Sequence, residues 1–438
     1  MIKGAASLRP RASRLNDDGT AARRVRRRCF AAIALAGVFS GEVALAQPQP
    51  ALSLHVRETA GIRRGVDPVN ARVPFPAGAL RDPAQVRLML EGKEVAAQVA
   101  PESRWPDDSI RWLAVDFNAS IGPLEQNEYR LEYGEGVARA APSGGLVVSE
   151  DAESIQVSLL RFGRSASPLI LSANYRQEFI APGEGGFVVV DLAGASHRLK
   201  CDPPGRVEIL KRGPLYVVLR YTGRISVAAG YEVPFVITLE MPNTKSWVKY
   251  IAEIEDPQNR LREIALLTPM AFAAFPWPWD FGTGSWSYGT LRRREDSVML
   301  VQETGAGAAG WKILAGPKGR EQPREIAAGA RPVQAEGWAH LQAGSKVIAL
   351  AVEHFGREAG AHTIAFDGQG LVALRFVPAA RAGRLRLAAY HHYVASPTPI
   401  GAGTGPVAML HPPVAFCDCG HYVASGAAPP PGAIDRRE

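Results

Sequence analysis

The strand-like pattern of the chain constrains its fold more than any other feature. From Leu52 onward, short runs rich in Val, Ile, Leu and aromatic residues are broken about every eight to twelve residues by Gly, Pro, Asp or Asn. Apolar and polar residues alternate over residues 215–221, 235–240 and 347–352, as in strands with one buried face. Helix-period segments, which an α/β fold needs between its strands, are absent. The sequence therefore predicts an all-β fold, with a small N-terminal β-barrel followed by a large antiparallel β-sandwich.

The first 46 residues have the layout of a cleavable export signal. Arginines cluster over residues 23–28, a short apolar stretch covers residues 30–39, and Ala44-Leu45-Ala46 precedes Gln47 as a small-x-small cleavage site. Arg27-Arg28-Cys29-Phe30 resembles a twin-arginine motif, so both Sec and twin-arginine export stay open. No later segment has the roughly 18 consecutive apolar residues of a membrane helix. We expect a periplasmic or secreted protein that begins at Gln47 and is not inserted in a membrane.

The positive charge of the chain belongs to this leader. The whole sequence has 50 Lys and Arg against 43 Asp and Glu, and residues 1–46 hold 9 and 3 of these, which leaves 41 and 40. No basic stripe with interleaved aromatic residues remains beyond the leader. We therefore predict no nucleic-acid partner.

Three cysteines, Cys201, Cys417 and Cys419, follow the leader, and three thiols cannot all pair within one chain. One disulfide or none is the simpler expectation. In an extended segment Cys417, Cys419 and His421 would share one face, but a structural zinc site needs a fourth ligand. We predict no metal site, and the sequence identifies no cofactor.

Two stretches of the predicted N-terminal barrel are specific enough to suggest a family. Residues 73–83 read VPFPAGALRDP and residues 104–117 read RWPDDSIRWLAVDF. They resemble the N-terminal barrel of the exo-rhamnogalacturonan lyase, or YetA-like, family, in which the corresponding phrases read VPFPKGALRDP and RWPDGSVRWLLLDF. The resemblance implies a RIFT-type β-barrel over residues 52–133.

The resemblance weakens beyond the barrel. After a linker at residues 134–146, residues 147–424 are similar in character to the β-sandwich of that family, and residues 425–438 are expected to form a flexible tail. Family members end in an α/α toroid, which we do not find in this sequence. Because the lyase site of the family is shared with the toroid, the resemblance implies contact with carbohydrate but assigns no catalytic residue here.

One strand carries side chains that suit elimination chemistry. As a strand, residues 384–394 place Arg386, Tyr390 and His392 on one face, which we expect to be exposed to solvent. β-Elimination at a uronate needs a cation near the carboxylate and a base near the C5 proton. Arg386 could supply the first, and His392 or Tyr390 the second. The alternative is a strand with ordinary surface polar residues.

Residues 275–288 form an aromatic cluster that contains Trp277, Trp279 and Trp286, interrupted by Pro and Gly. This composition predicts an irregular segment instead of a regular strand. The tryptophans either cap the sandwich core or form a platform for sugar rings, with Asp280 bonding to hydroxyl groups.

The sequence thus supports two functional hypotheses. In the first, the protein is an exported carbohydrate-interacting protein whose partner is an oligo- or polysaccharide, with a pectic polymer as one candidate, and it is either a minimal polysaccharide lyase or a binding module. In the second, it is a non-catalytic structural or interaction protein of the cell envelope. An open cleft lined by Trp277, Trp279, Trp286 and Arg386 would favour the first hypothesis, and burial of these residues the second.

Overall fold

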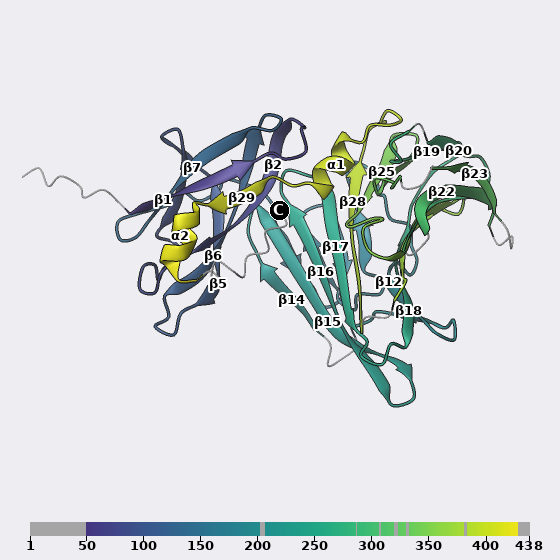
Figure 1. Cartoon of the computed structure of the whole chain (residues 1–438), viewed down its shortest axis with the longest axis horizontal. Helices are drawn as coiled ribbons and strands as arrows, with labels where there is room; N and C mark the ends of the chain where they lie inside the picture. The colour runs from purple at the N-terminus through teal and green to yellow at the C-terminus, as the bar shows by residue number, and fades with distance from the viewer. Residues whose placement is uncertain are drawn as a thin grey trace, which may run out of the picture. The chain divides into compact units, whose positions relative to one another are not determined.

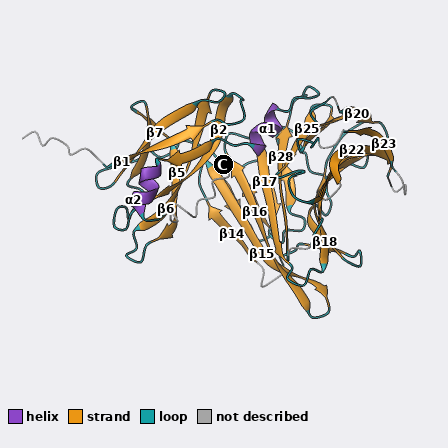
Figure 2. Ribbon diagram, in the orientation of Figure 1, coloured by secondary structure: helices purple, strands orange, loops and turns teal. Residues whose placement is uncertain are grey.

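The computed structural model describes residues 50–201, 206–285, 287–305, 308–318, 323–329, 333–380 and 383–427, without the side chains of residues 308 and 309. Strands dominate these residues (Figure 2), and their only helices are α1, Thr404–Leu410, and α2, Cys419–Ser425. The all-β prediction is confirmed. None of the helices in the described part of the chain is long and apolar enough to cross a bilayer. The export signal at residues 1–46 lies outside the described residues.

Two sheets form the N-terminal barrel and enclose one core. The five-stranded sheet has the order β29 (Val414–Cys417), β1 (Ala51–Arg57), β7 (Gln126–Tyr133), β3 (Val86–Leu90) and β4 (Lys93–Val95). The three-stranded sheet has the order β2 (Arg64–Pro74), β6 (Ile110–Ile121) and β5 (Ala97–Arg104). Alternate side chains such as Leu54, Val73, Leu113 and Leu131 point inward and are fully buried, as the period of two requires.

The barrel is completed by a strand from the other end of the chain. β29 pairs antiparallel with β1, with Leu54 opposite Cys417, and Figure 1 shows the yellow β29 beside the purple β1. The assignment of residues 414–424 to the sandwich is therefore wrong. The prediction of a flexible tail from residue 425 onward is wrong for residues 425–427. Ser425 is the last residue of α2, and Ser425 and Ala427 are both 3% exposed. Residues 428–438 lie outside the described part.

The remaining strands form three antiparallel sheets. The four-stranded sheet has the order β11 (Ile170–Ala173), β10 (Leu160–Gly163), β9 (Ser154–Val157) and β8 (Val148–Glu150). The eight-stranded sheet has the order β13 (Ser196–Arg198), β12 (Gly186–Asp191), β18 (Leu261–Pro269), β27 (Leu371–Pro378), β26 (Gly360–Asp367), β21 (Asp296–Gly305), β22 (Ala308–Pro317) and β23 (Arg324–Ala328). The nine-stranded sheet has the order β14 (Arg206–Lys211), β15 (Tyr216–Ala228), β16 (Tyr231–Pro242), β17 (Trp247–Glu255), β28 (Arg384–Val394), β25 (Lys346–Val352), β24 (Trp338–Ala343), β19 (Trp277–Phe281) and β20 (Tyr288–Leu291). One large core contains buried side chains from all three sheets.

The nine-stranded sheet has one face in this core and one face that the helix α1 partly covers. Met409 of α1 packs with Trp247, Trp338 and Tyr390 of the sheet. In Figure 1, α1 lies beside β17, β28 and β25. We call this second face the outer face. The segment of residues 395–413, which includes α1 and leads from β28 to β29, is called the crossover segment.

Cys417 lies in β29, whereas Cys419 and His421 lie in α2. No disulfide joins Cys201, Cys417 and Cys419, and no group of three or more His, Cys, Asp or Glu side chains among the described residues is placed to hold a metal ion. Burial raises the pKa of the Cys417 thiol to about 12, which keeps it protonated at neutral pH. The ring of His421 bonds through Nε2 to the carbonyl oxygen of Pro74 at 2.7 Å.

Candidate functional site

The aromatic cluster lies mostly inside the sandwich. Trp277 and Trp279 are 4% and 5% exposed and belong to β19, a regular strand that pairs with β20 and β24. The predicted irregular segment is wrong for residues 277–281, where Pro278 precedes the residues of β19 that pair with β24 and so interrupts no bond of that ladder. It is correct for residues 275–276 and 282–285, which belong to no strand. Trp286 lies outside the described residues. Burial leaves the rings of Trp277 and Trp279 no open face for a sugar, so the structure contradicts a platform at these two positions and agrees with the core-capping alternative.

Asp280 anchors the crossover segment. Its Oδ1 lies 2.8 Å from Nδ1 of His340, and its Oδ2 accepts a hydrogen bond of 2.6 Å from the amide of Gly401. Both Asp280 and His340 are buried, and they sit opposite each other on β19 and β24. Because Asp280 is 4% exposed and each of its carboxylate oxygens has a partner within the protein, the structure gives it a role in holding the crossover segment and no open surface for the sugar-binding role that the sequence suggested. His340, which the sequence analysis did not single out, is its partner.

Arg386, Tyr390 and His392 do share the outer face of β28, but solvent does not reach that face freely. Tyr390 and its neighbour Ala388 are 4% and 1% exposed, and Arg386 and His392 are partly buried. The expectation of a solvent-exposed face is therefore wrong. The sequence pattern of β28 could not show the cover, because α1 comes from a later part of the chain.

Two residues that the sequence did not single out organise this face. Lys249 of β17 places Nζ 2.6 Å from Oε1 of Glu353 and 5.3 Å from the ring centroid of Tyr390. Oε2 of Glu353 accepts from Arg386 at 3.1 Å, and the Tyr390 hydroxyl lies 3.4 Å from Oε1. Burial alone would raise the pKa of Glu353, but Lys249 and Arg386 outweigh it and hold that pKa below its ordinary value. Glu353 thus stays ionised and fixes both cations.

A cavity of about 160 Å³ opens beside this cluster, large enough for roughly five water molecules. We call it the sheet cavity. The sheet side of its lining consists of Tyr216, Glu240, Trp247, Lys249, Tyr390 and His392. Asp67, Pro68 and Asn70 of the barrel strand β2 and residues of the crossover segment line it elsewhere. The Tyr216 hydroxyl donates to Oε2 of Glu240 at 2.9 Å, so two side chains of neighbouring strands are held in place before any ligand enters.

The protonation states of the cavity follow from burial. Burial, helped by Lys245 and His340, lowers the pKa of His392 to about 4, so its imidazole is neutral at pH 7. Burial also raises the pKa of Tyr390 above its ordinary value, which keeps the phenol protonated. The neutral imidazole could accept a proton, whereas the phenol is a donor.

A larger groove lies beside the sheet cavity. It measures about 580 Å³ and shares Asn70, Tyr216 and Glu240 with the cavity. Its walls come from β2, β5 and β6 of the barrel and from β14, β15 and β16 of the sandwich, and we call it the interdomain groove. Lys211 and Asp116 bridge the two walls, with Nζ 3.0 Å from both carboxylate oxygens. The sheet cavity is thus the smaller of two neighbouring recesses that share lining residues at the junction of the barrel and the sandwich.

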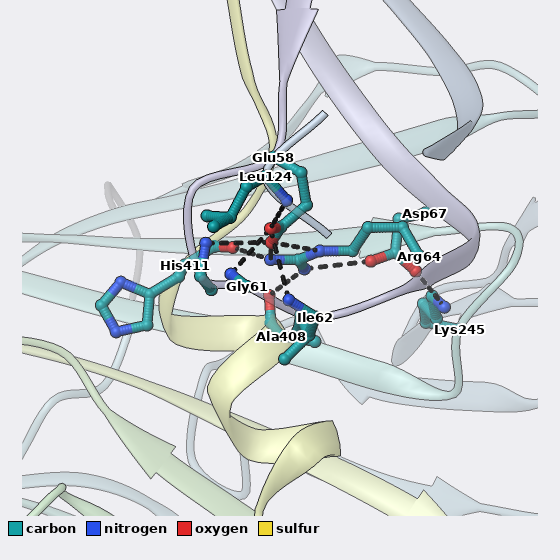
Figure 3. A network of polar contacts seen from close by, with 10 residues as sticks. Glu58, Gly61, Ile62, Arg64, Asp67, Leu124, Lys245, Ala408 and His411 are labelled. Atoms are coloured by element: carbon teal, nitrogen blue, oxygen red, sulfur yellow. Dashed lines mark hydrogen bonds and ion pairs between the residues drawn. The ribbon is translucent and has the colours of Figure 1, made fainter. Parts of the chain in front are cut away.

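A buried charge network holds the crossover segment in place (Figure 3). The Arg64 guanidinium lies 2.9 Å from Oε1 of Glu58 and 3.1 Å from Oδ2 of Asp67, and it donates to the carbonyl oxygens of Ala408 and His411. Asp67 also forms an ion pair with Lys245. Burial raises the pKa of Glu58, but the amide of Leu124 and the Arg64 side chain lower it to about 2 overall. The barrel thereby fixes the helix that covers the outer face.

The barrel sequence has a known counterpart. Residues 63–134 match the PcRGLX-like N-terminal RIFT barrel domain. This match agrees with the resemblance to rhamnogalacturonan lyases at the level of the barrel, and it covers less than half of the chain. No curated protein matches the sequence.

Solved structures show that the fold extends beyond the RIFT barrel. A protein of glycosyl hydrolase family 38 from Enterococcus faecalis is similar with a TM-score of 0.53 and 10% identity, over 84% of this chain and 47% of that chain. This chain therefore spans about half the length of that relative. A galactose mutarotase related enzyme from Lactobacillus acidophilus matches with a TM-score of 0.30 and 7% identity, over 58% of this chain and 99% of its own. The first similarity shows a shared fold.

Proposed function

We propose that the protein binds an oligo- or polysaccharide, with one sugar unit in the sheet cavity and further units along the interdomain groove. The observation that carries this proposal is the lining of the cavity, where Tyr216, Trp247 and Tyr390 stand beside Glu240 and Lys249. Aromatic surface combined with a few fixed polar groups is typical of small-molecule sites and suits sugars, which have apolar C–H faces and polar edges. The RIFT barrel match and the fold shared with a family 38 glycosyl hydrolase are consistent with such a ligand.

The buried tryptophans bear on the competing hypothesis. Because Trp277 and Trp279 are in the core, the platform no longer supports sugar binding, and their burial by itself favours a non-catalytic envelope protein. The sheet cavity supports sugar binding independently of these residues. The two hypotheses therefore differ in whether that cavity takes a ligand.

Glycan binding can be tested with one isosteric substitution. We expect the mature chain from Gln47 to bind members of a glycan array, and Glu240→Gln to weaken binding of the best neutral glycan at least tenfold, about 1.4 kcal/mol, because hydrogen bonds to a charged acceptor are lost. Glu232→Gln on the same strand, whose side chain is 61% exposed in a surface ion pair with Arg224, is the matched control. Equal binding by wild type and Glu240→Gln in calorimetry would contradict the proposed site.

β-Elimination on a pectic polymer is a second candidate activity. It is favoured by His392, whose neutral imidazole lines the same cavity as Tyr390. Arg386 is already held by Glu353, so it would have to leave that ion pair to neutralise a uronate. If elimination occurs, His392→Gln should abolish the absorbance near 235 nm from unsaturated uronate while glycan binding changes little. If the wild-type protein produces no absorbance change on any pectic substrate, elimination is contradicted and glycan binding remains as the only proposed function.

We also propose that the protein is exported and cleaved before Gln47, as the leader predicts. N-terminal sequencing of the periplasmic protein should give Gln47. Replacing Arg27 and Arg28 by Lys separates the routes, because twin-arginine export should stop and Sec export should continue. Retention of Met1 on the accumulated protein would contradict export by cleavage.

A further inference from the structure

The charged side chains that line the sheet cavity balance one another. Two are cations, Lys245 and Lys249, and two are carboxylates, Asp67 and Glu240. Lys245 is paired with Asp67, and Lys249 is paired with Glu353 at 2.6 Å, just outside the lining. The second carboxylate oxygen of Glu353, Oε2, forms an ion pair with Arg386. Each lining cation therefore already faces a carboxylate of the protein.

A negatively charged sugar unit would meet an unfavourable environment here. A uronate carboxylate that enters a partly closed cavity loses water, and this loss is offset only where an unmatched cation or several free donors replace it. The lining cations are engaged, and Glu240 and Asp67 would repel a second carboxylate nearby. Sugar hydroxyls can donate to Glu240 and accept from Lys249, because a hydroxyl is both donor and acceptor.

We propose that the sheet cavity takes a neutral, hydroxyl-rich sugar unit and discriminates against the corresponding uronate. This inference rests on the proposed function, since it names the ligand class of the same cavity. It does not extend to the interdomain groove, where Arg220 adds a cation that the cavity lacks. Occupation of the cavity by a neutral unit also argues against elimination at a uronate held there.

The test compares sugars that differ at one carbon. For the glycan that binds most tightly in the array, calorimetry is repeated with its counterpart in which the C6 hydroxymethyl is a carboxylate, or with its carboxyl-reduced form if it is a uronate. The neutral member should bind at least tenfold more tightly, and its Kd should change less than twofold between 20 and 500 mM NaCl, because no ion pair forms with the ligand. A uronate that binds equally or more tightly would overturn the inference and leave carbohydrate binding intact. Absence of binding by every glycan would instead overturn the proposed function.

A charge variant provides a second, independent readout. Glu240→Gln removes one of the two carboxylates from the lining and makes the net charge of the lining positive, so the affinity for the uronate relative to the neutral sugar should rise at least tenfold. Glu232→Gln should leave this ratio unchanged. An unchanged ratio in folded Glu240→Gln, with a melting temperature close to that of the wild type, would show that lining charge does not set the preference.

Discussion

His391 lies between the sheets of the sandwich, one residue away from the outer-face side chains of β28. It is 0% exposed, its Nδ1 is 3.4 Å from the Thr268 hydroxyl, and its Nε2 has no hydrogen-bond partner among the described residues. Burial lowers the pKa of His391 to about 3, so it is neutral in the folded protein at any moderate pH. A buried neutral histidine makes the free energy of unfolding depend on pH.

The sign of this dependence is fixed by the lowered pKa. In the unfolded chain His391 takes up a proton below its ordinary pKa of about 6.5, while the folded protein does so only near pH 3, so its stability contribution is complete above pH 6.5 and decreases as the pH falls toward 3. Between pH 7 and pH 5 we expect His391 alone to cost about 2 kcal/mol. Urea unfolding of His391→Gln should show a correspondingly flatter pH dependence. Thr268→Val, which removes no titrating group, should keep the slope of the wild type, and an equally steep slope in His391→Gln would contradict this assignment.

The residues that form the site were only partly predictable. Arg386, Tyr390 and His392 were found because neighbours on one strand face can be read from alternation alone. Lys249 and Glu353 were missed because their partners lie on strands that are distant in sequence, and no local pattern encodes such pairs. The aromatic density around Trp277 was noticed, but composition cannot distinguish a buried cluster from an exposed one.

The helix α1 depends on the barrel more than on its own sequence. It has seven residues, no side-chain cap at its N-terminus and no basic residue in its last turn, so it would be marginal in isolation. Its position is fixed by Met409 against Trp247 and Tyr390 and by the hydrogen bonds from Arg64 to Ala408 and His411. The cover of the outer face therefore relies on a side chain from the other end of the chain.

Substitution of Arg64 should release this cover. Arg64→Met leaves the buried Glu58 without its cation and should cost about 3 to 5 kcal/mol. Arg64→Lys keeps the charge but cannot reach the two carboxylates and two carbonyl oxygens together, so it should cost less and still speed hydrogen exchange of the α1 amides. Arg72→Lys, in a surface pair with Glu102, is the control and should change neither quantity. Unchanged exchange of α1 in Arg64→Lys would mean that Arg64 does not hold the helix.

The elements of the barrel show what a sequence can and cannot predict. β6 follows from the motif at residues 104–117, where alternation and turn residues agree. β29 has only four residues, and its alternation fits either domain equally well. Its place beside β1 depends on the burial of Cys417 in the barrel core. This burial requires contacts with residues such as Leu54, which lie near the other end of the chain.

Considered as a whole, the chain combines a RIFT barrel with a large sandwich, and the candidate site exists only where the two meet. β2 supplies Asp67 and Asn70, the nine-stranded sheet supplies Tyr216, Glu240 and Lys249, and the crossover segment closes the cavity. The two domain types could be predicted from strand pattern and motif. Their junction could not, because it depends on side chains from β2, β16, β17, β28 and α1 that approach one another only in the folded chain.

The most direct test of carbohydrate binding at this junction is a crystal structure of the mature protein with the glycan that binds most tightly in the array. We expect electron density for one sugar unit within hydrogen-bond distance of Glu240 in the sheet cavity, beside Trp247, with the next units in the interdomain groove. Electron density for the glycan on any other surface, with the sheet cavity holding only water, would contradict it.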